Sequence, residues 1–125
     1  DRIWFAQRKV ILNLAEKENC VIVGRCADYL LKDKADCLNV FVYAAPEFRA
    51  QRIVKLYGES PVAPLKRLAD KDKKRKLNYK YFTEQEWGKT QNYHMCLDSG
   101  YLGIENVVDL IVNTFRKKGE IESGK

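Results

Sequence analysis

The 125-residue chain has no long hydrophobic run. Every uninterrupted apolar stretch is much shorter than a membrane-spanning helix, which needs about 20 residues. The CxxC spacing typical of zinc and redox sites is also absent, because the cysteines stand apart at Cys20, Cys26, Cys37 and Cys96. Residues 1–15 mix charged and apolar side chains as an amphipathic helix does, unlike a secretory signal. We therefore expect a cytoplasmic protein with free thiols and no membrane partner.

The composition is that of a soluble globular protein. Hydrophobic residues make up 46% of the sequence and charged residues 32%, which argues against intrinsic disorder. A length of 125 residues is sufficient for one hydrophobic core. We therefore treat residues 1–125 as a single domain.

The positive charge of the chain is concentrated in one segment. The formal net charge is +6. Between Lys66 and Lys80 stand eight basic residues and two acidic ones, so this segment carries the whole excess and the rest of the chain is neutral. Such a concentration is typical of a surface that binds a polyanion, either the phosphates of a nucleotide or the backbone of a nucleic acid.

Hydrophobic periodicity predicts an alternation of helices and strands. Apolar residues at helical spacing predict helices up to residue 17 and over 27–32, 46–57, 62–79 and 104–115. Short continuous apolar runs predict buried strands at 20–23, 38–43 and 93–97. Alternation of this kind indicates a parallel sheet with right-handed crossovers, an α/β fold. Because so few strands are predicted, we expect the chain to be the C-terminal part of a larger domain.

The first segment with chemical potential follows the predicted strand at 20–23. Gly24 allows a turn there, and Arg25 presents a planar fork that suits a phosphate or carboxylate. Ligands of open α/β sheets bind at the carboxyl ends of strands. A turn glycine followed by a solvated arginine is the alternative interpretation.

The second segment is the basic helix. Asp72 and Arg75 are three residues apart and are therefore neighbours on a helix surface. A solvated helix with local ion pairs would explain them, but the excess of bases over acids favours anion binding. The aromatic residues that follow suit base stacking or, more simply, packing of this segment onto the domain: Tyr79, Tyr81, Phe82 and Trp87. We favour packing, and we interpret His94 as structural.

In their order and spacing, these segments resemble the cytidylate kinase-like proteins, a family of P-loop nucleoside monophosphate kinases. The resemblance extends from about Ile3 to Phe115. The matching segments are Gly24-Arg25-Cys26-Ala27-Asp28, Asp72-Lys73-Lys74-Arg75, the aromatic residues up to Trp87-Gly88, and Tyr93 with Cys96-Leu97-Asp98-Ser99.

The resemblance implies a partial three-layer parallel sheet of the P-loop NTPase type, with a basic helical lid over residues 60–90. It also implies phosphoryl transfer from ATP, with Mg²⁺, to CMP or a related nucleoside monophosphate. By the same resemblance the acceptor site comprises Gly24, Arg25, Asp28 and Asp72. Asp72 would contact the acceptor sugar or orient a lid arginine.

The remaining implied roles belong to cations of the basic helix. Lys73 and Arg75 would stabilise the transferring phosphoryl group. Arg67 and Lys71 would bind ATP. Phosphoryl transfer depends mainly on positioning and on neutralising negative charge, which is consistent with these residue types.

The sequence departs from the family pattern in three respects. Cys26 stands where the family carries an acidic residue, and Leu68 stands where a further lid arginine is expected. The GxxxxGK[ST] loop, whose backbone cradles phosphates, does not occur in these residues. We therefore expect a fragment that is inactive alone, although its parent protein is a kinase.

A nucleic-acid- or nucleotide-binding module without catalysis, including a kinase fold kept only for binding or regulation, is the less favoured alternative. The affinity of a nucleic-acid module would fall steeply with salt, whereas a mononucleotide site would discriminate among bases. We also expect a truncated sheet to expose an apolar face or an edge through which the chain self-associates.

Overall fold

The chain folds mainly into helices. A computed structural model describes residues 2–24, 26–33 and 36–123. In chain order its elements are α1 (Arg2–Lys17), α2 (Ala27–Leu30), β1 (Val40–Tyr43), α3 (Pro46–Tyr57), α4 (Pro64–Thr83), the 3-10 helix η1 (Thr90–Asn92), β2 (Met95–Asp98), α5 (Ser99–Leu102) and α6 (Ile104–Ser123). Within the described residues, no helix is long and apolar enough to cross a membrane.

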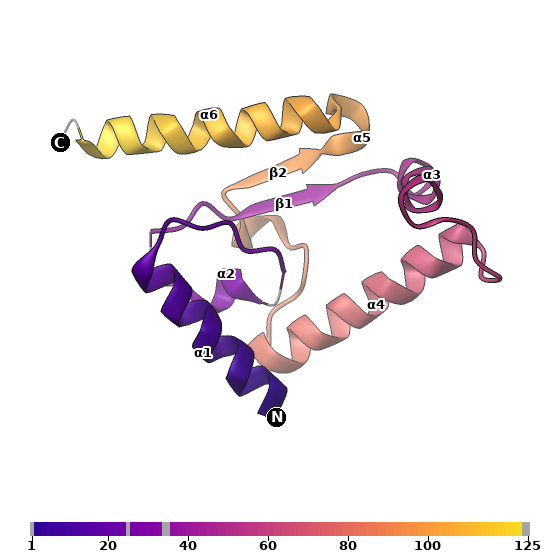
Figure 1. The fold of residues 1–125 in the computed structure, drawn as a ribbon, viewed down its shortest axis with the longest axis horizontal. Coiled ribbons are helices and arrows are strands. Elements are labelled where there is room, and N and C mark those ends of the chain that lie inside the picture. The colour runs from indigo at the N-terminus through magenta and orange to yellow at the C-terminus, as the bar shows by residue number, and fades with distance from the viewer. Residues whose placement is uncertain (1, 25, 34–35, 124–125) are drawn as a thin grey trace.

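The two strands form a parallel pair. Val40 lies opposite Met95 and Tyr43 opposite Asp98, so the strands are in register over their whole length. α3 begins shortly after β1, and α5 begins directly after β2. Figure 1 shows α4 running from α3, at the carboxyl ends of the strands, back toward α1. The α3–α4 hairpin therefore begins at the carboxyl end of the sheet, which is the end where α/β proteins bind ligands.

Local sequence explains where several helices begin and end. α3 and α4 both start with a proline, whose fixed φ suits the first helical position. α3 ends at Gly58, whose φ of 80° is unfavourable for residues with a side chain. The predicted helices up to residue 17 and over 46–57 are confirmed with these bounds.

The predicted strand at 20–23 is wrong. These residues form no strand and pair with neither strand of the described chain. Val21 is 93% exposed and Val23 85% exposed, although the apolar run had suggested a strand covered on both faces. A strand needs a neighbour to hydrogen-bond, and this segment has none among the described residues. The expected three-layer parallel sheet is thus corrected to a largely helical α/β arrangement around a two-stranded parallel sheet.

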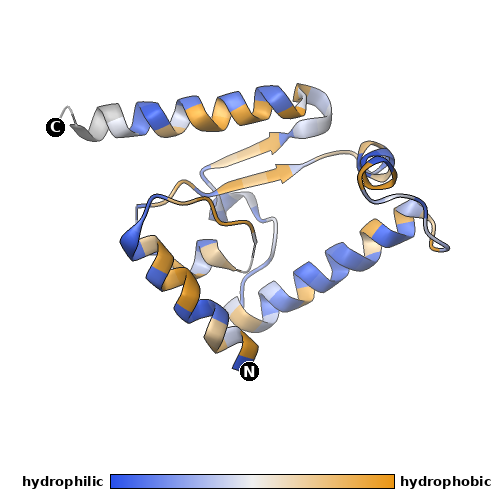
Figure 2. Ribbon diagram, viewed as in Figure 1, coloured by the Kyte–Doolittle hydropathy of each residue, from blue (hydrophilic) through white to orange (hydrophobic). Residues whose placement is uncertain are grey.

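The main buried cluster lies between α1 and α2. It consists of Ile11, Ala27, Leu30 and Leu31, each less than 9% exposed, with Trp4 and Ile22 packed against it. Figure 2 shows hydrophobic colouring on both strands and along α1 and α6, whereas α4 is mostly hydrophilic. Apolar side chains of α1 and α6 nevertheless remain exposed, among them Phe5, Val10, Val108 and Phe115.

Aromatic residues at the end of α4 and in the following loop pack onto the domain as predicted. Phe82 stacks on Trp4 with ring centroids 4.2 Å apart, which joins the end of α4 to α1. Trp87 meets Phe41 of β1 edge to face at 5.3 Å. Tyr81 is the exception, because 78% of it is exposed. Aromatic contacts therefore tie both the end of α4 and the following loop to the rest of the fold.

Candidate functional site

The carboxyl ends of β1 and β2 are covered by the first turns of two helices. Asp98 ends β2, and its Oδ1 accepts hydrogen bonds from the backbone N–H groups of Gly100 at 3.0 Å and Tyr101 at 3.1 Å. Gly100 packs so closely that a Cβ there would lie 3.2 Å from the Phe48 ring. The first turn of α3, which carries Phe48 and Arg49, is thereby fixed at this end of the sheet.

Arg49 leads to the most concentrated charge arrangement in the described chain. Its Nη1 donates to Asp72 Oδ2 at 2.6 Å, and its Nη2 donates to Asp72 Oδ1 at 3.0 Å. Arg75 Nη1 donates to the same Oδ1 at 2.8 Å. We call Arg49, Asp72 and Arg75 the arginine cluster. It presents two planar guanidinium forks, the geometry best suited to a phosphate, with one carboxylate between them.

The arginine cluster is half-buried and electrostatically coupled. The side chains of Arg49, Asp72 and Arg75 are 31%, 23% and 50% exposed. The hydrogen bond from Arg49, followed by that from Arg75, holds the pKa of Asp72 below its ordinary value, although burial opposes this effect. Asp72 is therefore ionised at neutral pH, and the cluster keeps one excess positive charge. The two arginine side chains remain partly exposed, so an anion can approach them and is attracted by the excess positive charge.

The other predicted cations of α4 lie elsewhere on the helix. Arg67 Nη1 donates to the Gly58 carbonyl at 2.9 Å, and Lys71 Nζ lies 5.7 Å from the centre of the Tyr57 ring. Both contacts join α4 to the end of α3. Lys73 is exposed, and two helical positions separate it from Arg75, so the two side chains point to different sides of α4. The structure brings Asp72 and Arg75 together, but neither Lys73 nor Arg67 joins them.

The predicted acceptor turn lies beside α2. Gly24 is exposed with a φ of 70°, and Cys26 also has a left-handed backbone, with a φ of 58°. Arg25 lies outside the described residues. Asp28, in α2, accepts a hydrogen bond at 2.7 Å from the hydroxyl of Tyr79, which is only 4% exposed. Burial, followed by this hydrogen bond, raises the pKa of Tyr79 above its ordinary value.

A hydrogen bond connects the predicted acceptor turn to the basic helix α4. Tyr79 belongs to α4 and Asp28 to α2, so one hydrogen bond joins the predicted acceptor segment to the predicted lid. Burial, and then the neighbouring Asp28 carboxylate, raises the pKa of the Cys26 thiol. Cys26 therefore does not take over the negative charge of the acidic residue that it replaces in the family pattern.

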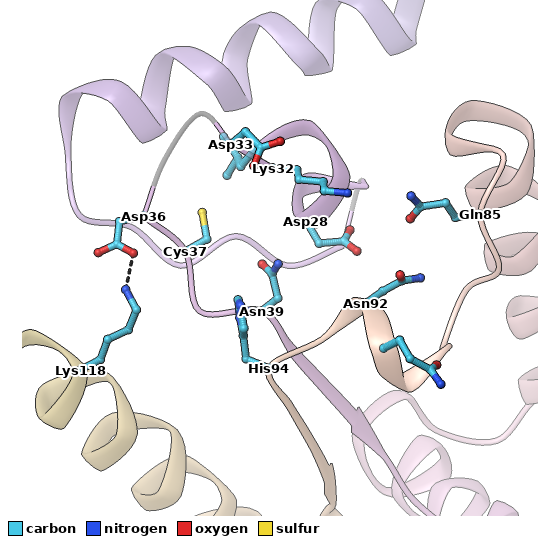
Figure 3. A pocket seen from close by; sticks show the side chains of 12 residues that line it. Asp28, Lys32, Asp33, Asp36, Cys37, Asn39, Gln85, Asn92, His94 and Lys118 are labelled. Atoms are coloured by element: carbon cyan, nitrogen blue, oxygen red, sulfur yellow. Dashed lines mark hydrogen bonds and ion pairs between the residues drawn. The ribbon is translucent and has the colours of Figure 1, made fainter.

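A polar cavity of the described chain does not coincide with the arginine cluster. It has a volume of about 440 Å³ and a polar lining to which Asp28, Asn39, Gln85, Asn92 and His94 contribute (Figure 3). Asn39 and His94 directly precede β1 and β2, and the Asn39 N–H donates to His94 Nδ1 at 2.8 Å. The cavity thus opens at the amino ends of the strands. Of the predicted site residues that the structure describes, only Asp28 lines it, so we take the arginine cluster as the candidate site.

Arg49 is the member of the arginine cluster that the sequence analysis did not identify. It stands 23 residues before Asp72, in a helix of ordinary composition. Its position in the first turn after a predicted strand was the one available signal. Among the described residues, no three His, Cys, Asp or Glu side chains are grouped closely enough to hold a metal ion.

Comparison with known proteins identifies the family of this chain. The sequence profile of the cytidylate kinase-like family matches residues 1–101. A cytidylate kinase from Archaeoglobus fulgidus is 30% identical over 106 residues, which cover 84% of this chain and 58% of that protein. A cytidylate kinase from Aeropyrum pernix is 27% identical over 108 residues, which cover 86% of this chain and 62% of that protein.

A solved structure extends the similarity to the fold. An uncharacterized protein from Eubacterium ventriosum superposes with a TM-score of 0.85 at 27% identity, over 92% of this chain and 65% of that chain. The present chain thus spans about three fifths of the length of the curated relatives that it matches. On the profile match over most of its residues, the chain belongs to the cytidylate kinase-like family.

Proposed function

We propose that this chain supplies the acceptor site and the lid of an ATP-dependent nucleoside monophosphate kinase of the P-loop NTPase type. The reaction is transfer of the γ-phosphoryl group of ATP to CMP or a related nucleoside monophosphate. Membership of the cytidylate kinase-like family supports this reaction class. The observation that carries the proposal is the arginine cluster beyond the carboxyl ends of the strands.

The chemistry of phosphoryl transfer explains the value of such a cluster. The transition state spreads negative charge over the oxygens of the transferred group, so an enzyme contributes mainly positioning and positive charge. Arg75 is the arginine with more exposed surface, and it can turn from Asp72 toward a phosphate. Arg49 is held by two hydrogen bonds and keeps Asp72 in place. In this assignment Asp72 orients the lid arginine.

The remaining residues receive roles from the family resemblance. Gly24, Arg25 and Asp28 contribute to the acceptor site, and Lys73 assists Arg75 at the transferring group. Arg67 and Lys71 bind ATP after leaving their contacts at the end of α3. Residues 60–90 act as the lid. Closure of a lid over both nucleotides excludes the water that would otherwise accept the phosphoryl group.

ATP and Mg²⁺ need residues that these 125 positions do not contain. The sequence has no GxxxxGK[ST] loop to cradle the ATP phosphates. The described residues also offer no metal-binding group of side chains, so we assign no step to Mg²⁺. We accordingly propose that residues 1–125 do not hydrolyse or transfer phosphate alone. Magnesium-dependent ATP turnover by this chain would contradict that statement.

The proposal is tested by substituting Arg75 in a protein extended to the full length of its cytidylate kinase relatives. Arg75→Ala should lower kcat by at least about 100-fold and change the Kd for CMP by less than about threefold, because the arginine acts chiefly on the transition state. Lys74→Ala is the matched control, since Lys74 is exposed on the same helix and forms no hydrogen bond or ion pair with the cluster in the described chain. Steady-state kinetics and CMP titration give both quantities.

An unchanged kcat in Arg75→Ala would remove Arg75 from the mechanism. Arg25→Ala addresses the acceptor site separately. We expect it to raise the KM for the monophosphate while ATP binding stays the same. A loss confined to ATP would mean that Arg25 belongs to the other nucleotide site.

A further inference from the structure

The basic helix α4 has one side packed against the protein and another exposed to solvent. One side faces the protein and carries Leu68, Asp72, Arg75, Tyr79 and Thr83, which recur every three or four residues. Leu68, Tyr79 and Thr83 are buried, and Asp72 and Arg75 form the arginine cluster. The arginine cluster, which carries the kinase proposal, therefore lies on this inward side.

The surplus lysines lie on another side. Lys66, Lys73, Lys76 and Lys80 recur at intervals of seven, three and four residues, which places them along one edge of the helix. We call these four residues the lysine stripe. It is about 21 Å long, since a helix rises about 1.5 Å per residue. All four residues are exposed.

Little within the described chain neutralises the lysine stripe. Lys66 pairs with Asp70 at 3.2 Å, but both side chains are more than half exposed, so this pair contributes little. Lys80 Nζ donates to the Glu84 carbonyl at 3.1 Å. Lys73 and Lys76 have no ion-pair or hydrogen-bond partner among the described residues. Like charges three or four positions apart destabilise a helix, and a polyanion laid along the stripe would remove that repulsion.

We propose that the lysine stripe binds the phosphate backbone of a nucleic acid strand. A straight row of positive charges matches a linear polyanion, and each lysine can approach a separate phosphate. The exposed apolar residues of α4, namely Leu65, Leu77 and Tyr81, are too few and too widely spaced to form the continuous apolar face with which an amphipathic helix enters a membrane. The stripe itself contains no aromatic residue to stack on bases. Binding is therefore independent of base sequence.

The test is a fluorescence anisotropy titration of the chain with labelled single-stranded RNA, single-stranded DNA and duplex DNA. Binding to at least one of them should weaken with salt, with a log–log slope of about −2 to −4 for three or four phosphate contacts. The three probes establish which nucleic acid is preferred. Phosphatidylserine-containing vesicles test the alternative that the lysine stripe binds an anionic membrane surface.

The decisive comparison uses two variants of equal charge. Lys66→Glu, Lys76→Glu and Lys80→Glu together should weaken nucleic acid binding at least about tenfold at low salt and make the slope shallower by about 2. Lys9→Glu, Lys89→Glu and Lys117→Glu change the net charge equally at exposed positions away from the stripe. This control should bind within about threefold of the unsubstituted chain, because the loss depends on position.

Three results would overturn the inference. An equal loss of nucleic acid affinity in both variants would show that binding depends only on the net charge of the chain. No measurable binding to any nucleic acid at low salt would exclude nucleic acid as the partner of the lysine stripe. Binding to vesicles but not to nucleic acid would assign the stripe to a membrane surface. Circular dichroism verifies that both variants keep their helices. Neither variant changes Lys73 or the arginine cluster, so none of these outcomes bears on the kinase proposal.

Discussion

Single residues hold the functional arrangement together through charge. Asp72 is the shared acceptor of Arg49 on α3 and Arg75 on α4, so it joins the two helices and holds both arginine side chains. Tyr79 performs a similar function at the other end of α4, where it holds Asp28. These two residues lead to separate predictions.

Asp72→Asn should lower the free energy of unfolding by about 1 kcal/mol at neutral pH, because it replaces charge-assisted hydrogen bonds with weaker ones. The pKa of Asp72 is lowered in the folded state, so its contribution is present above the unfolded pKa of about 3.9 and is lost as the pH falls below it. The difference between variant and unsubstituted chain should therefore shrink toward about pH 3. Urea denaturation at the two pH values measures this.

Asp70→Asn is the matched control for that experiment. Within the described chain Asp70 pairs only with Lys66, and its side chain is 54% exposed, so its removal should change stability by less than about 0.5 kcal/mol. If Asp72→Asn behaves like Asp70→Asn, the arginine cluster contributes nothing to stability.

Tyr79→Phe should lower the free energy of unfolding by about 1 kcal/mol, because it leaves the Asp28 carboxylate without its donor. The pKa of Tyr79 is raised in the folded state, so its contribution is complete below the unfolded pKa of about 10 and is lost as the pH rises above it. The variant should accordingly show weaker destabilisation at alkaline pH. Tyr81→Phe, at a residue 78% exposed, should change neither property. Thermal unfolding across the alkaline range distinguishes the two.

Whole elements follow the sequence where their determinants are local. Prolines and apolar periodicity predict α1 and α3 with their observed bounds, and β1 and β2 lie within or next to the predicted segments. The segment at 20–23 shows the limit, because strand formation depends on a hydrogen-bonding neighbour that its own residues do not encode. Arg49 was missed for the same reason. Its importance arises from a contact 23 residues away.

The loop after α4 offers a test of element packing. Gly88 has a φ of 81°, and a Cβ there would lie 3.2 Å from Cζ of Phe41. Gly103 has a similar φ of 85°, but a Cβ there would meet no atom of the described chain within 4 Å apart from its chain neighbours. Gly88→Ala should therefore destabilise the fold by about 1–2 kcal/mol more than Gly103→Ala, since both suffer backbone strain but only Gly88→Ala also meets a ring. If urea unfolding gives the same loss of stability for both variants, the Phe41 ring moves aside for the added methyl group without a cost in free energy.

At the scale of the whole molecule, a small core coexists with much exposed apolar surface. The outer side of α1, the segment at 20–23 and the outer side of α6 all carry exposed aliphatic residues. A two-stranded sheet and one buried cluster give limited stability on their own. The relatives are longer than this chain, which spans 58% and 62% of the two cytidylate kinases.

This exposure predicts self-association of residues 1–125. Sedimentation velocity at increasing protein concentration should show a growing dimer or larger fraction. Val21→Lys with Val23→Lys should reduce it, because these two side chains are 93% and 85% exposed and apolar. Asn13→Lys with Asn19→Lys adds the same charge at exposed polar positions and should leave it unchanged. A monomer at every concentration would contradict this expectation.

The central claim is that the arginine cluster belongs to a nucleoside monophosphate kinase, and one measurement tests it most directly. A coupled ATP-consumption assay is performed on the protein extended to the length of its cytidylate kinase relatives, with CMP, UMP, AMP and GMP as acceptors. We predict Mg²⁺-dependent turnover that is fastest with CMP. A folded protein that contains the phosphate-binding loop and yet consumes no ATP with any of the four would contradict the claim.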